Sequence, residues 1–199
     1  RSFCFHKPKP CVVFFLSHTH TFSHPFSFGR LYNFDGKSIQ KRAEDCEAIW
    51  TSSSTIVDDD TFLVADHFLN LYSYQKQTRA ASEVDSLLLK CDGTYHLGDM
   101  VNRFSRGSIV MRTQDSIIGE TEGVIFGTLF GMIGMIFSLP EPLYDFLSRV
   151  DEAVCQVLKP FGGFSHKEFR AREIPHRRSE ALGFIDGDVV EKLLFMSFE

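Results

Sequence analysis

Between residues 31 and 139, the apolar residues of the chain fall into short runs that are separated by turn residues. Short runs bounded by Gly and Asp are typical of β-strands joined by tight turns. Gly107 and Gly131 stand at hairpin positions, where a positive φ is often needed. Several such strands favour a sandwich, a barrel or propeller blades, and the pattern alone does not choose among them. The predicted strands cover residues 47–57, 61–65, 68–74, 94–104, 108–112, 123–130 and 132–139.

The composition fits a mostly β, globular protein of one or at most two domains. The 199 residues are 43% hydrophobic and 24% charged, and the 21 phenylalanines suit a pleated surface. A formal net charge of -5 excludes an overall electrostatic attraction to a phosphate backbone. The five cysteines are far apart and form no C-x-x-C pair, so we expect reduced thiols rather than a disulfide framework or a zinc site.

After residue 139 the hydrophobic period changes to that of an amphipathic helix. Apolar side chains recur at steps of three and four residues from 143 to 158. Ser138 and Glu141 have the spacing of a capping box, and Pro140 is predicted in the first turn. Residues 164–182 are predicted to be irregular. A second helix is expected to begin at Asp188, capped by Asp188 and Glu191.

Residues 1–30 differ in composition from the rest of the chain, which begins at Arg1 and is interpreted as a fragment. The segment is rich in Phe, Ser, Pro and His, and alternating histidines on a strand could share a face and bind a metal. Such compositional bias is more typical of a poorly packed or non-native leader. The apolar run at 11–16 is too short for a membrane helix and lacks a cleavage site, so we expect no secretion signal. The histidines are His6, His18, His20 and His24.

Two acidic clusters contain the carboxylates that a cation site or a hydrolase needs. Residues 58–60 are three aspartates, which could hold a cation or serve a propeller hydrolase, but a solvated turn is the more ordinary role of such a run. Asp186, Asp188 and Glu191 resemble part of a calcium loop, yet the remaining oxygen ligands are missing. Helix capping is therefore the interpretation we favour for the second cluster. We predict no catalytic residue, metal or cofactor.

A basic segment follows the first helix. Its positive residues are interleaved with Phe164 and Phe169, which could stack on single-stranded bases. A solvated connector is the alternative, because acidic neighbours dilute the field. The weak candidates for nucleic-acid contact are Lys167, Arg170, Arg177 and Arg178.

A series of short segments between residues 42 and 199 carries a resemblance. Their order and spacing resemble the C-terminal region of the family of the large subunit of the damaged-DNA-binding protein, an adaptor of cullin-4 ubiquitin ligases built from three propellers. The large subunit of the cleavage and polyadenylation specificity factor and the third subunit of splicing factor 3b share this region. The segments are 57–63, 68–71, 95–99, 101–102, 107–111, 124–128, 131–134, 138–139 and 183–188.

The resemblance implies a domain organisation. Residues 31–139 would form the last blades of the third propeller, a partial β-propeller, and residues 140–199 would begin the helical C-terminal domain. Residues 1–30 stay unassigned. The resemblance also implies a non-enzymatic adaptor that acts in the nucleus, and also in the cytoplasm, in DNA repair and protein ubiquitination.

The resemblance further implies where partners bind. In that family, WD40-type substrate receptors insert helical elements into a propeller cleft, cullin-4 binds parts outside the matched region, and damaged DNA is reached through a receptor. Family positions lining the cleft fall on Trp50, Met100, Asn102 and Leu129. An aromatic anchor, two flexible apolar side chains and one amide suit an amphipathic helix. Taken alone, Trp50 is by default a core residue, with a binding hot spot as the alternative. The sequence differs from the family at Met100, where an aromatic is usual, and near Glu44, where a basic residue is usual. The alternative function is an RNA-processing scaffold that contacts nucleic acid.

Overall fold

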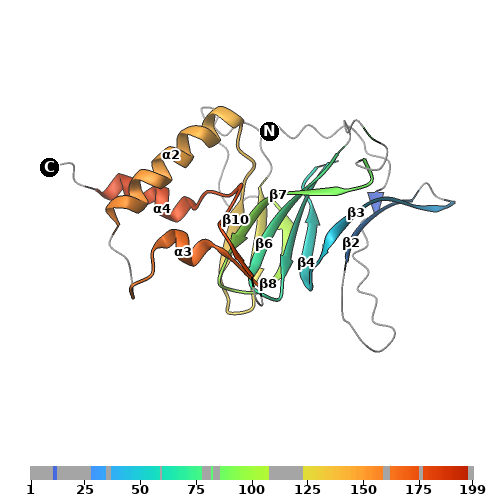
Figure 1. Ribbon diagram of the computed structural model, residues 1–199, viewed down its shortest axis with the longest axis horizontal. Helices are drawn as coiled ribbons and strands as arrows, with labels where there is room; N and C mark the ends of the chain where they lie inside the picture. The colour runs from blue at the N-terminus through green and yellow to red at the C-terminus, as the bar shows by residue number, and fades with distance from the viewer. Residues whose placement is uncertain are drawn as a thin grey trace.

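The computed structural model describes residues 11–12, 28–34, 37–58, 60–77, 82, 86–107, 123–158, 162–174 and 177–196. Figure 1 shows a row of antiparallel sheets with helices gathered on one side. The predicted strand at 108–112 and the leader histidines lie outside the described residues.

The central sheet is a four-stranded antiparallel meander, the form of a propeller blade. Its strands run in chain order, each paired with the next, and the turn between the first two is short. The fourth strand also makes an isolated bridge between Thr94 and Leu182, which joins the sheet to the C-terminal segment. The strands are β4 (Thr51–Ile56), β5 (Thr61–Asp66), β6 (Asn70–Lys76) and β7 (Leu89–His96).

Two three-stranded antiparallel sheets contribute the remaining blade strands. The first comprises β1 (Cys11–Val12), β2 (Phe28–Phe34) and β3 (Ile39–Ala48). The other comprises β8 (Val101–Arg106), β9 (Val124–Thr128) and β10 (Ile133–Ile136). Together with the central sheet they form a partial β-propeller, so the mostly β prediction is confirmed.

Strand β5 shows why the sheets stack. Phe62 and Val64 face one hydrophobic cluster, whereas Leu63 and Ala65 face a second cluster shared with β8 and β9. Because alternate side chains of a strand point to opposite faces, a run of apolar residues buries both faces at once. The central sheet is therefore packed between neighbours, as a blade inside a propeller must be.

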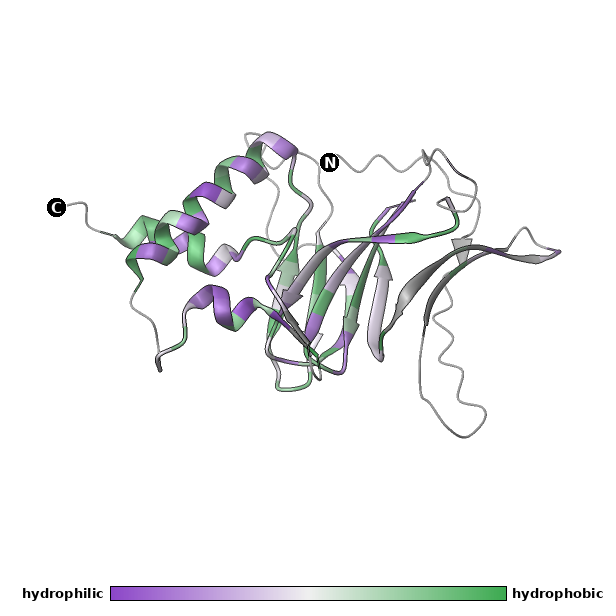
Figure 2. Ribbon diagram, in the orientation of Figure 1, coloured by the Kyte–Doolittle hydropathy of each residue, from purple (hydrophilic) through white to green (hydrophobic). Residues whose placement is uncertain are grey.

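The helical segment follows β10. Figure 2 shows hydrophobic and hydrophilic residues alternating along α2, as an amphipathic helix requires. In the described part of the chain, no helix has the length and apolar character needed to cross a membrane. The elements are α2 (Glu141–Val157), α3 (His166–Arg170), β11 (Arg172–Ile174), β12 (Arg177–Ser179), α4 (Gly187–Glu191) and the 3₁₀ helix η1 (Lys192–Phe195).

Several predicted boundaries differ from the structure. The strand expected at 94–104 is divided between β7 and β8, because residues 97–100 turn and Gly98 has a φ of 85°. The strand expected at 47–57 is likewise interrupted between Ala48 and Thr51. Residues 164–182, predicted as irregular, contain α3, β11 and β12. Both strand breaks coincide with backbone hydrogen bonds to another connection, between Leu97 and Leu69 and between His67 and Trp50. In contrast, α3 has a local capping box, and β11 pairs with β12.

Both predicted helix caps are wrong in detail. Pro140 is the N-cap of α2, no side chain caps that end, and Pro142 occupies the first turn. The cap of α4 is Asp186, whose side chain accepts a hydrogen bond from the Asp188 amide. The capping interpretation of this acidic cluster is thus confirmed, although Asp186 performs it instead of Asp188.

Candidate protein-interaction site

Four strand connections meet at one end of the sheets. The connections are β3–β4, β5–β6, β7–β8 and β9–β10, and backbone hydrogen bonds link them to one another. The His67 amide donates to the Trp50 carbonyl at 2.9 Å, and the Leu97 amide donates to the Leu69 carbonyl at 2.8 Å. The Leu129 amide donates to the Met100 carbonyl at 2.9 Å. We call this end the rim and define it by Trp50, Phe68, Met100, Asn102, Leu129 and Phe130.

The rim exposes large apolar side chains. Trp50 is 51% exposed, Leu129 60% and Phe130 83%, and Phe68 is also exposed. The Trp50 ring lies edge-on to the His67 ring, with centroids 5.6 Å apart. The core alternative for Trp50 is therefore excluded. Large apolar groups held near one another on a surface differ from ordinary scattered exposure and are a common feature of interaction sites.

Register shifts in two strand pairs, β4–β5 and β8–β9, shape the centre of the rim. The register shifts between Val101 and Arg103, so Asn102 lies in a bulge and its side chain is exposed. A second shift flanks Ser52, whose hydroxyl donates to the Val101 carbonyl at 2.9 Å. Because a bulge redirects a side chain, Asn102 is presented outward while Val101 stays buried.

The β9–β10 turn holds the outermost part of the rim. The Met132 amide donates to the Thr128 hydroxyl at 3.0 Å, and the Thr128 amide donates to the Met132 carbonyl at 2.9 Å. Gly131 has a φ of 91°, which confirms the positive φ predicted there. Leu129 and Phe130 are therefore displayed on a turn whose backbone is already bonded.

The structure brings together the four partner-binding residues expected from the sequence. Trp50 adjoins β4, Met100 and Asn102 flank the start of β8, and Leu129 bonds to Met100. Met100 is half-buried, whereas the other three are exposed. Phe68 and Phe130 belong to the same surface and were missed, because an apolar residue in a turn looks like an ordinary core residue in the sequence. The structure does not describe the side chain of Glu44.

The rim is a different place from the hollow between the sheets and the helices. This partly open cavity of about 1180 Å³ is lined by Leu63, Phe126, Leu147 and Phe184 among others. None of the four predicted partner-binding residues lines it. Small ligands favour concave sites, whereas the rim is an exposed surface.

The helical segment is attached to the central sheet by a group of polar residues that we call the clasp. It comprises Asp186, Tyr95, Arg170 and His166. Asp186 Oδ2 accepts from the Tyr95 hydroxyl at 2.8 Å and from Arg170 Nη2 at 2.7 Å, and His166 Nε2 lies 3.1 Å from it. Arg170 also donates to the carbonyls of His96 and Leu97.

The charged and polar groups of the clasp complement one another. Burial by itself would raise the pKa of Asp186, but the Arg170 charge and the hydrogen bonds from Tyr95 and Arg170 hold that pKa below its usual value. Burial lowers the pKa of His166, aided by the Arg170 charge and opposed by Asp186. Burial also raises the pKa of Tyr95 well above its ordinary value. The clasp thus pairs one carboxylate with one guanidinium, together with a neutral phenol.

A second polar cluster lies inside the blade. Asp66 Oδ2 accepts from the Tyr72 hydroxyl at 2.6 Å and from Asn70 Nδ2 at 3.0 Å. Arg172 Nε donates to the Tyr72 hydroxyl at 3.2 Å, and its guanidinium stacks over the Tyr72 ring. These side chains are buried, so the cluster ties the β5–β6 turn to β11.

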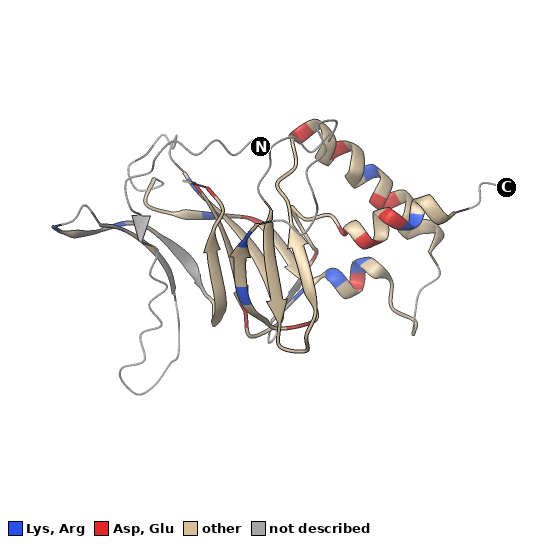
Figure 3. Cartoon of the chain, turned by 180° about the vertical axis from the view of Figure 1, so that it is seen from behind, with Lys and Arg blue, Asp and Glu red and all other residues tan. Residues whose placement is uncertain are grey.

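The weak nucleic-acid candidates are dispersed. Arg170 is used by the clasp, and Lys167 forms an ion pair with Glu152 at 3.0 Å. Arg177 and Arg178 lie on β12, and their side chains are not described. Figure 3 shows acidic and basic residues interspersed along the described helices.

Asp58 and Asp60 lie in the connection between β4 and β5. Asp58 Oδ1 accepts hydrogen bonds from the amides of Asp60 and Thr61, at 2.8 and 2.6 Å. Such an aspartate closes a local turn with its own side chain. The turn interpretation of Asp58 is confirmed.

One group of possible metal ligands was missed. Asp151, Cys155 and His166 bring their donor atoms within 4.8 Å of one another. The signal in the sequence was the four-residue spacing of Asp151 and Cys155 on a predicted helix, which places both on one face. The third member comes from another helix and had no local signal.

These features define a class and then a family. Antiparallel blades with an exposed apolar rim, followed by clasped helices, define a propeller-type interaction module. Residues 26–194 match the family described as CPSF A subunit region, and the chain belongs to that family.

The chain is also similar to several curated proteins. It is 42% identical over 84% of its length to DNA damage-binding protein 1a of Arabidopsis thaliana, covering 15% of that protein. It is 39% identical over the same share to DNA damage-binding protein 1 of Solanum lycopersicum, again 15% of that protein. It is 36% identical over 78% of its length to DNA damage-binding protein 1 of Drosophila melanogaster, 14% of that protein. The chain therefore spans a small part of the relatives that it matches.

Proposed function

We propose that this chain contributes a protein-binding surface to a non-enzymatic adaptor in DNA-damage recognition, and that the rim is that surface. The observation that carries the proposal is the exposure of Trp50 and Leu129 on a backbone that is already hydrogen-bonded. Binding hot spots favour a large aromatic anchor on a preorganised surface, because little entropy is lost when the partner docks.

The similarity to DNA damage-binding proteins supports the wider role. We assign the chain to an adaptor of cullin-4 ubiquitin ligases that acts in DNA repair and protein ubiquitination, in the nucleus and also in the cytoplasm. The partners at the rim are the helical elements of WD40-type substrate receptors. Cullin-4 would bind other parts of the adaptor, and damaged DNA would be reached through a receptor.

The chemistry of the rim defines the shape of the partner. Trp50, Leu129 and Phe130 offer apolar area, and Asn102 offers one amide beside it. An amphipathic helix supplies spaced apolar side chains together with a polar edge. The amide of Asn102 would orient such a helix by one hydrogen bond.

The experiment is a binding titration with a helical peptide from a WD40-type receptor. Trp50→Ala is expected to weaken binding by about 2 kcal/mol or more, roughly 30-fold, as for other hot-spot aromatics. Asn102→Ala should weaken it by about 1 kcal/mol, the net worth of one hydrogen bond.

Matched controls lie on α2. Phe146→Ala removes an equally exposed aromatic, and Gln156→Ala removes an exposed amide, both away from the rim. Both control variants should bind as the parent does. Equal affinity of the parent and the Trp50→Ala variant would show that the receptor does not use the rim.

A nucleic-acid scaffold in RNA processing is the second candidate, and the basic residues interleaved with the exposed Phe164 and Phe169 favour it. In this case Lys167, Arg177 and Arg178 would contact phosphates, with Arg170 kept in the clasp. Binding of single-stranded RNA should then fall with salt and be lost in the Arg177→Ala, Arg178→Ala variant. Lys192→Ala, a cation change on η1, is the control. RNA binding that does not depend on salt, or that the Arg177→Ala, Arg178→Ala variant leaves unchanged, would exclude this candidate.

A further inference from the structure

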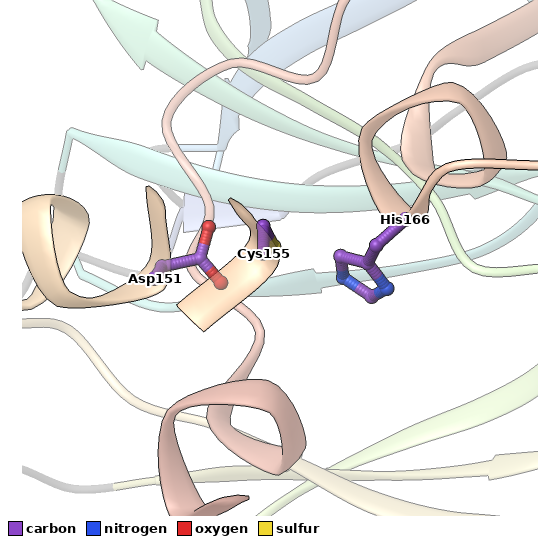
Figure 4. Close-up of side chains that lie close together, drawn as sticks. All are labelled: Asp151, Cys155 and His166. Carbon is purple, nitrogen blue, oxygen red and sulfur yellow. The ribbon is translucent and has the colours of Figure 1, made fainter. Parts of the chain in front are cut away.

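Three side chains that can bind a metal converge where α2 meets α3. Asp151 and Cys155 come from α2, and His166 is the first residue of α3. The carboxylate, thiol and imidazole atoms all lie within 4.8 Å of one another. Figure 4 shows Asp151 and Cys155 side by side on one helix, with the His166 ring approaching from the other.

Local structure places each of the three groups. Asp151 and Cys155 are four residues apart, so they occupy one face of α2, next to the buried Val154. His166 follows Ser165, which caps α3 through a complete capping box with Glu168. The first turn of α3 is therefore well defined, and the imidazole starts from a constrained backbone.

One oxygen of the Asp151 carboxylate lacks a hydrogen-bond partner among the described residues. This atom, Oδ1, is buried. Buried polar atoms are almost always satisfied, so an orphaned carboxylate oxygen calls for a donor or a cation. The neighbouring thiol and imidazole make a cation the better match.

The imidazole is oriented by a second carboxylate. His166 Nε2 lies 3.1 Å from Asp186 Oδ2, so this carboxylate holds the imidazole ring in place beside α2. A carboxylate partner of this kind fixes the tautomer and the ring orientation of a metal-binding histidine. Asp186 is itself held by Tyr95 and Arg170, so the orienting group is rigid.

We propose that Asp151, Cys155 and His166 form a binding site for Zn²⁺, with water in the fourth position. Sulfur and nitrogen ligands select a borderline transition metal, whereas Ca²⁺ and Mg²⁺ prefer oxygen alone. A thiolate, a carboxylate and a neutral imidazole carry two negative charges, which Zn²⁺ neutralises. The bound ion would release the thiol proton to solvent.

The site has a structural consequence. α3 is attached to β7 through the bonds of Arg170 to the carbonyls of His96 and Leu97. A metal bridge from α2 to the start of α3 would therefore fasten the long helix to the blade. Metal binding would stabilise the folded chain in proportion to metal concentration.

The test is a titration of the full chain with Zn²⁺, and with Co²⁺ as a spectroscopic probe. The parent for all variants carries His6→Gln, His18→Gln, His20→Gln and His24→Gln, so that leader histidines do not compete. We expect one metal per chain, a cobalt–thiolate charge-transfer band and a rise in thermal midpoint. Loss of an outer-shell group costs about 10–100-fold in affinity, so Cys155→Ser and Asp151→Asn should each weaken Zn²⁺ binding at least tenfold.

Matched controls separate the site from unspecific binding. Cys91→Ser changes the other cysteine whose burial is described, and Glu152→Gln removes the neighbouring exposed carboxylate. Both controls should keep the affinity, the band and the thermal shift. The metal-free midpoints of Cys155→Ser and Cys155→Ala should match the parent, which excludes misfolding as the cause of lost binding.

Three results would overturn the proposal. The first is absence of metal binding in the parent, and the second is a cobalt–thiolate band that survives Cys155→Ser. The third is an affinity for Zn²⁺ that Asp151→Asn leaves unchanged. Each is independent of receptor binding at the rim, so the two proposals can fail separately.

Discussion

The rim and the clasp reverse the usual placement of residues in opposite ways: the rim exposes apolar side chains, and the clasp buries charged ones. At the rim, apolar side chains such as Trp50 and Leu129 are exposed, and the backbone beneath them is hydrogen-bonded. At the clasp, the charged side chains of Asp186 and Arg170 are withdrawn from solvent and paired with each other.

The two regions are expected to serve different purposes, binding at the rim and stability at the clasp. Exposed apolar area contributes little to folding and is available to a partner. In contrast, removing one partner of a buried ion pair leaves the other charge buried and unpaired, which is strongly destabilising. We therefore expect rim substitutions to alter binding and clasp substitutions to alter stability. The four predictions below test that division, from the largest expected effect to the smallest.

Removing the carboxylate of the clasp should cause the largest loss. Asp186→Ala leaves Arg170 buried without its partner, which is expected to cost about 3–5 kcal/mol of unfolding free energy. Urea denaturation measures this loss. Asp188→Ala, an exposed aspartate in the first turn of α4, should cost less than about 1 kcal/mol. Similar losses for the two variants would mean that the clasp does not anchor the helices.

A matched pair of leucines compares the core with the rim. Leu63→Ala creates a cavity between the blades and should cost about 2–5 kcal/mol. Leu129→Ala removes an exposed side chain and should change stability by less than about 0.5 kcal/mol. Chemical denaturation of both variants gives the difference. A large loss at Leu129 would show that the rim serves folding rather than binding.

Two glycines with positive φ extend the comparison to the backbone. Gly183 has a φ of 72°, and an added Cβ would lie 2.5 Å from the Asp92 carbonyl oxygen, so Gly183→Ala should cost about 2–4 kcal/mol. Gly131 at the rim has a φ of 91° in open space, and Gly131→Ala should cost only about 1 kcal/mol. Thermal unfolding measures both. The reverse order would contradict the close approach of the C-terminal segment to β7.

The smallest effect concerns a single hydroxyl. Tyr72→Phe removes a donor from Asp66 and an acceptor from Arg172 inside the blade, at an expected cost of about 1–3 kcal/mol. Tyr144→Phe on α2 is the control, because no hydrogen bond of that hydroxyl is recorded among the described residues. Its stability should stay within about 0.5 kcal/mol of the parent. If both variants unfold alike, the Asp66 cluster does not contribute to stability.

Part of the fold could be predicted because its signals are local. The apolar runs of β5, β9 and β10 and the helical period of α2 lie within single elements, and the structure contains each of them. The boundaries were less accurate. The strand expected across Gly98 is broken because the Leu97 and Gly98 amides bond to Leu69, a partner far away in the sequence.

The candidate sites also differ in how far the sequence pointed to them. The family resemblance pointed to Trp50, Met100, Asn102 and Leu129, and the structure shows that they share one end of the sheets. The exposure of Trp50 was not predictable, because an isolated Trp beside a strand is by default a core residue. Nothing in the local sequence linked Asp151 and Cys155 to His166.

The sequence by itself determined several strands, helix α2, the mostly β class and the family, because hydrophobic period and motif order are properties of neighbouring residues. Only the tertiary structure decided which side chains are exposed and which charges meet. Asp186 illustrates the reason. In the sequence it is an acidic residue before a helix, whereas in the folded chain it caps α4, pairs with Arg170 and orients His166. The cap is a local contact, but the last two roles depend on packing between separate segments, which local sequence patterns do not encode.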